Sequence, residues 1–495
     1  MRALLWMFRG VAVVSALLLI ARGIAGPFWM LHNSITTECA LAISVICAWL
    51  TADRQGRAER DLTHHSRWAF ALVPVAAAIG FLPILSMPLV TDDYIHLRQI
   101  STGEAPTPLG CLIHSCGGPQ SFRPLGFATY WAEWELWDTA AMPRHGLDLI
   151  LHAISSLLFL LLLRRLGVGP PFDWLAGLFF AWNGIRAEAV AWPSARFDTL
   201  ALTFSLAAAL CVLRGSRIGL IGSVLATAAA CLSKESAYVL PVLLALLLGR
   251  GAIAGAGRVL IVSNAAVAVS IFAWRWVVLK GIGGYLQPDG LTPIVLQFHP
   301  LVLAKTFLAR IWGVLWFPVN WSRPLEWWMM LGLLAGAIGS CLLLYSRVDR
   351  KRVILCLAGV VVACVPTHHM LLIGPSLEHS RYLDFATPAF TLLVVFACLE
   401  LPRRAGAAAL ALLAVFQLAG LEHNLRIWSS VSTARYELCR GVAARARKTE
   451  GRITIGDLPM TVDGVHWRNG IEDCLWLEFD IPMGKVEVTG RVKER

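Results

Sequence analysis

Long apolar runs recur along most of this 495-residue chain, and short polar or basic segments separate them. A helix needs about 20 apolar residues to cross a bilayer, so runs of about 17 to 23 residues predict transmembrane helices. The pattern predicts about thirteen transmembrane helices, at residues 3–21, 38–52, 68–90, 147–163, 172–183, 197–213, 217–232, 236–249, 257–279, 329–346, 353–368, 386–401 and 405–421. The chain is therefore expected to be an all-α polytopic membrane protein.

The same pattern divides the chain into three parts. Residues 1–67 are expected to hold two N-terminal transmembrane helices, and the first apolar run reads as an uncleaved helix because a second run follows closely. The main transmembrane domain, residues 68–421, carries predicted external loops at 91–146, 183–196, 280–328 and 366–385. Residues 422–495 are polar and predict a small extracytoplasmic α/β tail, with a helix at about 423–448 and strands starting near 452.

Charge fixes the expected orientation of these helices. The chain is 57% apolar and only 15% charged, with a formal net charge of +11. The basic residues collect in short loops, which places those loops in the cytoplasm, the N terminus inside and the C terminus outside. They are Arg2, Arg9, Arg54, Arg57, Arg60, Arg67, Arg164, Arg165, Arg214, Arg217, Arg250, Arg258, Arg347, Arg350, Lys351, Arg352, Arg403 and Arg404. The expected location is the bacterial cytoplasmic (inner) membrane, and no basic stripe suggests nucleic-acid binding.

Four of the twelve cysteines fall in segments that we place outside: Cys111, Cys116, Cys439 and Cys474. An oxidising compartment favours the disulfide pairs Cys111–Cys116 and Cys439–Cys474. Free thiols remain an alternative for both pairs. A metal site at Cys111, His114 and Cys116 is a third reading, although three ligands on so tight a loop match zinc spacing poorly.

Two adjacent carboxylates, Asp92 and Asp93, follow the apolar run 68–90 directly. Ionised groups held at the edge of hydrocarbon usually mark function, although two solvated loop acids are the plain alternative. Further polar residues without a topological role lie near the external ends of the predicted helices. They are Arg123, Arg186, Glu188, Arg196, Asp198, Lys234, Glu235, Glu378, His379 and Arg381. Loops that join helix pairs converge on one surface, so we expect these groups to share a cavity.

This mixture of charges suits sugar transfer from a lipid phosphate to a hydroxyl group. A carboxylate deprotonates the acceptor, and Arg and Lys bind the phosphate as charge develops on its oxygens. One carboxylate suffices for an inverting displacement because the phosphate is a good leaving group. The alternative readings are that Arg186 and Arg196 only reach toward lipid headgroups, and that Lys234 and Glu235 form a structural ion pair.

Several of these stretches also resemble a known family. They are Asp92-Asp93-Tyr94, Phe122-Arg123-Pro124-Leu125, the spaced histidines His145 and His152, Glu188-Ala-Val-Ala-Trp192-Pro-Ser-Ala-Arg196-Phe-Asp198, Leu232-Ser233-Lys234-Glu235, and Pro366 to Arg381-Tyr382-Leu383. In this order they resemble the GT-C glycosyltransferases, integral membrane enzymes that take a sugar from a polyprenyl-phosphate carrier. The likeness is to the protein O-mannosyltransferase-like group, including the branch that usually carries TPR repeats, which are not seen here.

The resemblance implies a role for each matching residue. One of Asp92 and Asp93 is the expected base, and Arg123, Arg196, Lys234 and Arg381 are expected to bind the donor phosphate. The implied partners are a polyprenyl-phosphate-linked sugar donor, a hydroxyl acceptor on protein, lipid or glycan, and membrane lipids. No cofactor or metal is expected, and if a divalent cation were needed its oxygen ligands would be Asp92, Asp93 and Glu188.

The sequence departs from the group in places, so sugar and acceptor stay open. Asn183-Gly184 stands where His-Pro is common, and Arg186 stands where a His is common. Two other functions are kept as alternatives. One is a polytopic transporter or permease for a lipid-linked or small polar substrate, although the charges lie at one surface and no internal repeat is found. The other is a non-catalytic membrane scaffold.

Overall fold

The computed structural model describes residues 2–25, 34–52, 67–118, 120–249, 251, 255–284, 293–296, 299–371 and 373–490. Of the predicted cytoplasmic basic residues, Arg54, Arg57, Arg60 and Arg250 lie outside the described residues, as does part of loop 280–328. Eight described helices are long and apolar enough to cross a membrane, and five shorter apolar helices accompany them. These overlap the predicted runs, so the expectation of an all-α polytopic chain is confirmed.

The first half of the chain forms α1 (Arg2–Ala25), α2 (Ser34–Thr51), α3 (Ala69–Phe81), α4 (Asp92–Ser101), α5 (Pro124–Trp137), α6 (Ala141–Arg165), α7 (Phe172–Ala181), α8 (Arg186–Ala191), α9 (Arg196–Arg214), α10 (Arg217–Ser233), α11 (Leu240–Leu248) and α12 (Gly255–Leu279). The second half forms α13 (Pro300–Thr306), α14 (Trp312–Trp316), α15 (Trp327–Leu343), α16 (Arg350–Cys364), α17 (Thr387–Leu399), α18 (Arg403–Lys448) and α19 (Ile471–Phe479).

The C-terminal unit contains the described strands, as expected. They are β1 (Ile453–Leu458), β2 (Thr461–Val462), β3 (Val465–His466) and β4 (Val486–Gly490). β1 pairs with β4 in parallel, and β2 pairs with β3 as an antiparallel hairpin. The prediction of a small α/β tail with strands from about residue 452 is confirmed.

Two predicted helix boundaries are wrong. The helix predicted for 68–90 ends at Phe81, continues as a 3-10 turn over Leu82–Ser86 and is then extended. Pro83 and Pro88 explain this end, since proline lacks a backbone N–H and disfavours helix in the residue before it. The predicted boundary at 421/422 falls inside α18, a single helix of 46 residues.

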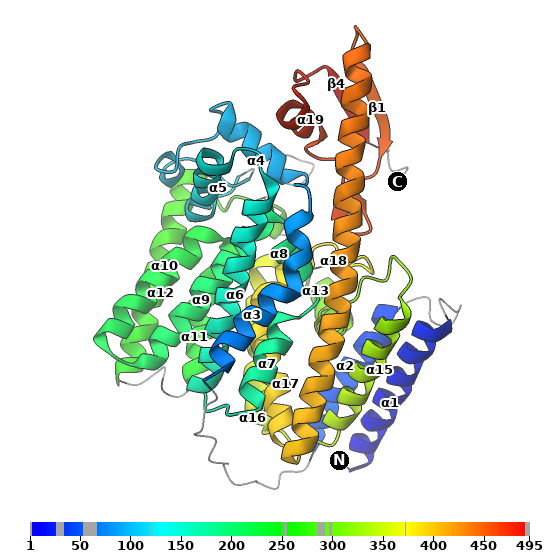
Figure 1. Ribbon diagram of the computed structural model, residues 1–495. Coiled ribbons are helices and arrows are strands. Elements are labelled where there is room, and N and C mark those ends of the chain that lie inside the picture. Colours follow the sequence, from blue (N-terminus) through cyan, green and yellow to red (C-terminus); the bar gives the residue numbers. More distant parts are fainter. Residues whose placement is uncertain are drawn as a thin grey trace.

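Hydropathy drops along α18 although its backbone stays helical. The segment after Leu421 is polar but consists of residues that helices accept, so nothing there stops hydrogen-bond propagation. In Figure 1, α18 (orange) runs from the lower end of the helical bundle to the top, where α19, β1 and β4 lie beside it. One rigid helix therefore links the membrane part to the C-terminal unit.

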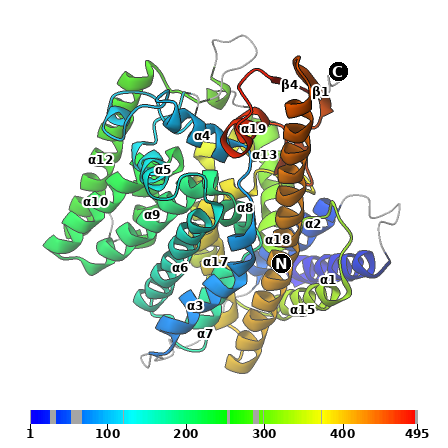
Figure 2. The ribbon, with the colours of Figure 1, turned by 45° about the horizontal axis from the view of Figure 1, so that its top comes forward.

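The upper end of the molecule brings α4 and α5 close to α19 and the outer part of α18 (Figures 1 and 2). A buried apolar cluster joins them and includes Tyr94, Ile100, Cys439, Ile471 and Leu475. The cluster is separate from the main core, which runs through the apolar helices below. The C-terminal unit is thus packed onto the loop over residues 91–146, next to Asp92.

Candidate functional site

A cavity of about 660 Å³ opens at this upper end, a volume within the usual range for ligand pockets. Its walls come from α4 and the loop after it, the start of α5, the turn between α8 and α9, the start of α9, the turn after α10, α12, the segments after α16 and before α17, and the C-terminal unit. Five of the charged residues selected from the sequence line it: Asp92, Arg123, Lys234, Glu235 and Arg381. Stretches far apart in the chain therefore meet around one volume, as the sequence predicts.

The two aspartates have different surroundings. Asp93 is fully buried and is not part of the cavity wall. Its Oδ1 accepts hydrogen bonds from Ser194 N (2.8 Å), Ser194 Oγ (2.7 Å) and Tyr130 Oη (3.1 Å), and its Oδ2 accepts one from Val90 N (3.0 Å). Burial raises the pKa of Asp93 to about 6 despite these hydrogen bonds. Asp93 fastens the start of α4 to the turn before α9.

Asp92 faces the cavity instead. No hydrogen bond or ion pair to its carboxylate occurs within the described ranges. Burial raises the pKa of Asp92, while Arg381 and Arg123 oppose that rise. The preceding residue, Thr91, has φ = 37°, a conformation that a β-branched residue rarely adopts. Strain of this kind persists where surrounding structure enforces it, as at functional sites.

Four cations line the cavity, and each has a carboxylate partner. Arg123 Nε lies 3.2 and 3.1 Å from the two oxygens of Glu235, and Arg275 Nη2 lies 3.7 Å from Glu235 Oε1. Lys234 pairs with Asp198. Arg381 pairs with Glu188. The cations therefore outnumber the three carboxylates that pair with them.

Burial lowers the pKa of Lys234 to about 8, and Asp198 opposes that fall. Its ammonium lies 4.9 Å from the centre of the Tyr382 ring. A lysine with a lowered pKa holds its proton weakly. An anionic ligand beside the ammonium group would raise this pKa again.

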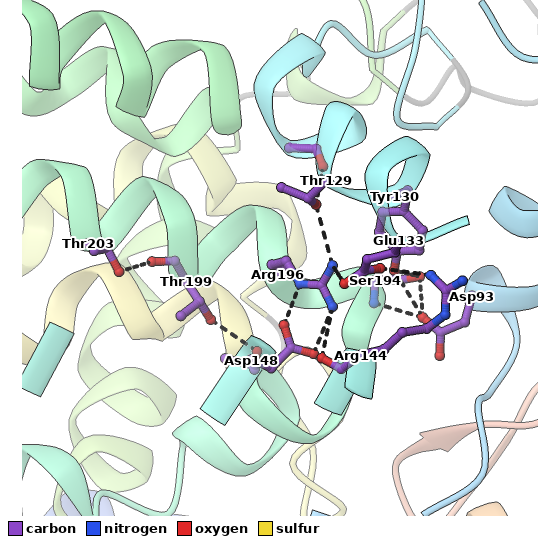
Figure 3. Close-up of polar contacts among 12 residues, drawn as sticks. Asp93, Thr129, Tyr130, Glu133, Arg144, Asp148, Ser194, Arg196, Thr199 and Thr203 are labelled. Atoms are coloured by element: carbon purple, nitrogen blue, oxygen red, sulfur yellow. Dashed lines mark hydrogen bonds and ion pairs between the residues drawn. The ribbon is translucent and has the colours of Figure 1, made fainter. Parts of the chain in front are cut away.

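Arg196 and Arg186 do not line the cavity. Arg196 is completely buried, with Nε 2.5 Å from Asp148 Oδ1 and Nη1 paired with Glu133, and Arg144 Nη1 lies 2.8 Å from Glu133 Oε2 (Figure 3). Two arginines and two acids thus form a closed network beneath the cavity. Their positions do not support direct contact with a donor phosphate.

Arg186 is completely buried as well. Its Nε lies 3.2 Å from Asp384 Oδ1, and its Nη2 donates to Ser155 Oγ at 3.2 Å. Glu188 lies behind Arg381 and is also outside the cavity wall. These side chains hold α8 against α6 and the 3-10 turn Ser380–Ala386.

Sequence reasoning missed two parts of this site. Arg275 lines the cavity but is not among the residues selected from the sequence, although an arginine inside an apolar helix usually has a function. Asn469, which lines the cavity, belongs to the C-terminal unit. A Cβ atom at Gly470 would lie 2.3 Å from Thr91 O, so this unit touches the backbone beside Asp92. Nothing in the sequence pattern placed the tail there.

The predicted cysteine pairs are neighbours in space. Cys116 Sγ lies 3.9 Å from Cys111 O, and Cys439 and Cys474 belong to the same buried apolar cluster. All four are free thiols in this structure. Both pairs lie in segments at the cavity end of the chain, and their oxidation remains a prediction.

Comparison with known proteins gives few similarities. No protein-family model matches the chain. A protein O-mannosyl-transferase of Caenorhabditis elegans is 32% identical over 104 residues, which is 20% of this chain and 15% of that relative. Over this short stretch the resemblance to O-mannosyltransferases is confirmed.

Two solved structures share a weak likeness with most of the chain. They are ArnT from Cupriavidus metallidurans bound to undecaprenyl phosphate, and the same protein in the apo state. Each is 16% identical to this chain with a TM-score of 0.40, and the matches cover 87% and 86% of both chains respectively. The assignment of an activity therefore rests on the residues of the cavity.

Proposed function

We propose that this chain is an integral membrane glycosyltransferase that moves a sugar from a polyprenyl-phosphate-linked donor to a hydroxyl acceptor. The observation that carries the proposal is that a single cavity is lined by four cations and by the carboxylate of Asp92, which has no hydrogen-bond or ion-pair partner among the described residues. A base and a phosphate-binding set are the two parts that such a transfer requires. The local similarity to an O-mannosyl-transferase supports the same reaction class.

The reaction is an inverting displacement. Asp92 accepts the proton of the acceptor hydroxyl, whose oxygen attacks the anomeric carbon of the sugar. The bond from that carbon to the phosphate oxygen breaks, and its electrons leave with the polyprenyl phosphate. Arg123, Lys234, Arg275 and Arg381 stabilise the charge that develops on the phosphate, and no step requires a cofactor.

The remaining predicted residues position this set. Asp93 holds α4 to the turn before α9, and Arg196 fixes that turn from below through Asp148. Glu235 keeps Arg123 and Arg275 oriented while the cavity is empty of anion. We place the site on the extracytoplasmic side, because the basic loops that face the cytoplasm by the positive-inside rule lie between the opposite ends of these helices.

The test is a donor assay with purified protein in lipid nanodiscs. A panel of polyprenyl-phosphate sugars is incubated with hydroxyl acceptors, and mass spectrometry follows the free polyprenyl phosphate. Release that depends on the acceptor and stops in Asp92→Asn supports the proposal. Asp457→Asn is the matched control, because Asp457 is exposed and has φ = 60°, which Asn accepts well. If no donor in the panel gives free polyprenyl phosphate, the proposed function is contradicted.

A further inference from the structure

Three potential metal ligands from distant parts of the chain meet behind the cavity wall. They are Glu188 in α8, His379 just before the turn Ser380–Ala386, and His466 in β3. One ligand atom from each lies within 4.8 Å of the other two. None of the three lines the cavity itself. They form a cluster that the proposed reaction does not use.

Two imidazole nitrogens of this cluster lack a hydrogen-bond partner within the described residues. His379 Nδ1 and His466 Nε2 are buried and have no hydrogen-bond partner within the described part of the chain. Buried polar atoms are normally bonded, so two such atoms side by side call for an explanation. Neutral imidazole nitrogen is the most common metal ligand in proteins.

A carboxylate lies behind His379 in the way that metal-binding histidines usually show. The Nε2 atom of His379 is 3.6 Å from Glu378 Oε1, too far for a direct hydrogen bond, but the negative charge at that distance favours the tautomer with the proton on Nε2. In this tautomer Nδ1 of His379 carries the lone pair that is free to bind a metal ion. A carboxylate in this place fixes the ring and increases the basicity of the ligating nitrogen.

The backbone around the two histidines is held in place. His379 has φ = 71°, a left-handed conformation that is uncommon for residues other than glycine. A Cβ at Gly464 would lie 2.1 Å from Ser376 O, so the β2–β3 hairpin sits directly on the segment that leads to His379. Asn320 Nδ2 donates to Ser376 O at 2.9 Å and to Asp463 O at 2.8 Å, which ties the two segments together.

Glu188 is held by its own contacts. Its Oε2 accepts hydrogen bonds from Arg381 N (3.0 Å) and Ser380 Oγ (3.2 Å), and the Arg381 guanidinium pairs with Oε1. A carboxylate offers about four lone-pair sites, so these contacts leave one for a cation. Glu188 and Glu378 together offset the positive charge of Arg381 near the cluster.

We propose that Glu188, His379 and His466 bind a divalent transition-metal ion, with Zn²⁺ as the best match. One carboxylate oxygen and two imidazole nitrogens are a known zinc ligand set that leaves a fourth position open. Calcium and magnesium are disfavoured because they prefer oxygen ligands. Tetrahedral bonds of about 2.0–2.1 Å put ligand atoms about 3.3 Å apart, so these side chains would close by about 1.5 Å at most.

The ion would have a structural role at the cavity wall. The His466 ring lies 4.9 Å from the Trp192 ring, and the Arg381 guanidinium lies 4.6 Å from it. Trp192 and Arg381 both line the cavity. Metal binding would therefore join the C-terminal hairpin to α8 and fix these two side chains. This inference holds whether or not the proposed reaction is correct.

Metal content of the full-length protein tests the proposal. Protein purified in detergent is stripped with a chelator, titrated with Zn²⁺ alone and measured by inductively coupled plasma mass spectrometry. We expect about one ion per wild-type chain and a rise in melting temperature, both lost in His379→Ala and His466→Ala. His299→Ala is the matched control, since His299 is exposed and its replacement should leave both values unchanged. Glu378→Gln should weaken binding about 10–100-fold.

A second measurement needs no variant. Co²⁺ titrated into the stripped wild-type protein should give the visible absorption of a four-coordinate ion and lose it when Zn²⁺ is added. Wild-type protein that retains less than a tenth of an equivalent of Zn²⁺ and shows only octahedral Co²⁺ would overturn the proposal. Equal Zn²⁺ binding by wild type and His466→Ala would overturn it too.

Discussion

Replacing each of the two adjacent aspartates by asparagine should give opposite results. Asp92→Asn removes the carboxylate that faces the cavity and leaves no partner behind, because that carboxylate makes no hydrogen bond or ion pair within the described residues. Asp93→Asn leaves a carboxamide where four hydrogen bonds now converge on a carboxylate. The first change should remove activity at unchanged stability, and the second should reduce stability.

The expected sizes follow from these contacts. Loss of a general base costs about 10²- to 10⁴-fold in rate, or about 3 to 5 kcal/mol of barrier. In Asp93→Asn the new amide N–H group faces the N–H group of Val90. Two buried donors then face each other, and neither has an acceptor. Leaving a buried donor unsatisfied costs about 1–3 kcal/mol of folding stability. The two variants should therefore separate in a plot of turnover against melting temperature.

The assay measures turnover of polyprenyl-phosphate sugar under single-turnover conditions, with melting temperature from the same preparations. Asp457→Asn should match wild type in both values. Turnover of Asp92→Asn within threefold of wild type would refute its role as base. A melting temperature of Asp92→Asn as low as that of Asp93→Asn would refute the structural distinction between them.

Three further predictions concern other parts of the site. Turnover should fall at high pH as Lys234 loses its proton near its pKa of about 8. In a pH–rate profile, Lys234→Arg should move this alkaline limb to higher pH, and an unmoved limb would assign it to another group. Gly126→Ala should reduce donor affinity at least several-fold, because the added Cβ would lie 2.2 Å from the ring of Phe197 in the cavity wall, and unchanged affinity would mean that the ring moves freely. Cys439 and Cys474 should be found as a disulfide by mass spectrometry of non-reduced peptides, and alkylation of both without reductant would contradict the external placement of the tail.

The decline of activity at low pH in the same pH–rate profile depends on Asp92. Asp92 must be ionised to accept a proton, and burial raises its pKa. Activity should therefore decline as pH falls through a value higher than that of an exposed aspartate. For folding stability the sign at Asp93 is the reverse. Its folded pKa, about 6, is above the unfolded value, so its contribution is fully present below the unfolded pKa and is lost as pH rises through about 6.

The helices were predictable because a membrane imposes both their length and their composition. The overlap of α6, α9 and α12 with predicted runs follows from that constraint alone. The continuity of α18 was not predictable, since hydropathy reports the surroundings of a segment and not whether its backbone hydrogen bonds continue. The early end of α3 had a visible signal in Pro83 and Pro88, which the length of the apolar run concealed.

The site was predictable as a set of loops but not side chain by side chain. Adjacent residues in a helix point about 100° apart, so only one of Asp92 and Asp93 can face the cavity, and the sequence does not say which one. The buried role of Arg196 had a partial signal in Asp148, an acid within an apolar run that requires a partner. The position of His466 had none, because it depends on how the tail folds back.

Donor binding tests the central claim most directly, namely that cations from distant stretches bind a lipid phosphate beside Asp92. Equilibrium affinity for polyprenyl phosphate in nanodiscs is compared among wild type, Lys234→Glu and Lys305→Glu, whose lysine is exposed on α13. We predict at least tenfold weaker binding for Lys234→Glu and wild-type affinity for Lys305→Glu. Equal affinity in all three proteins would contradict the account.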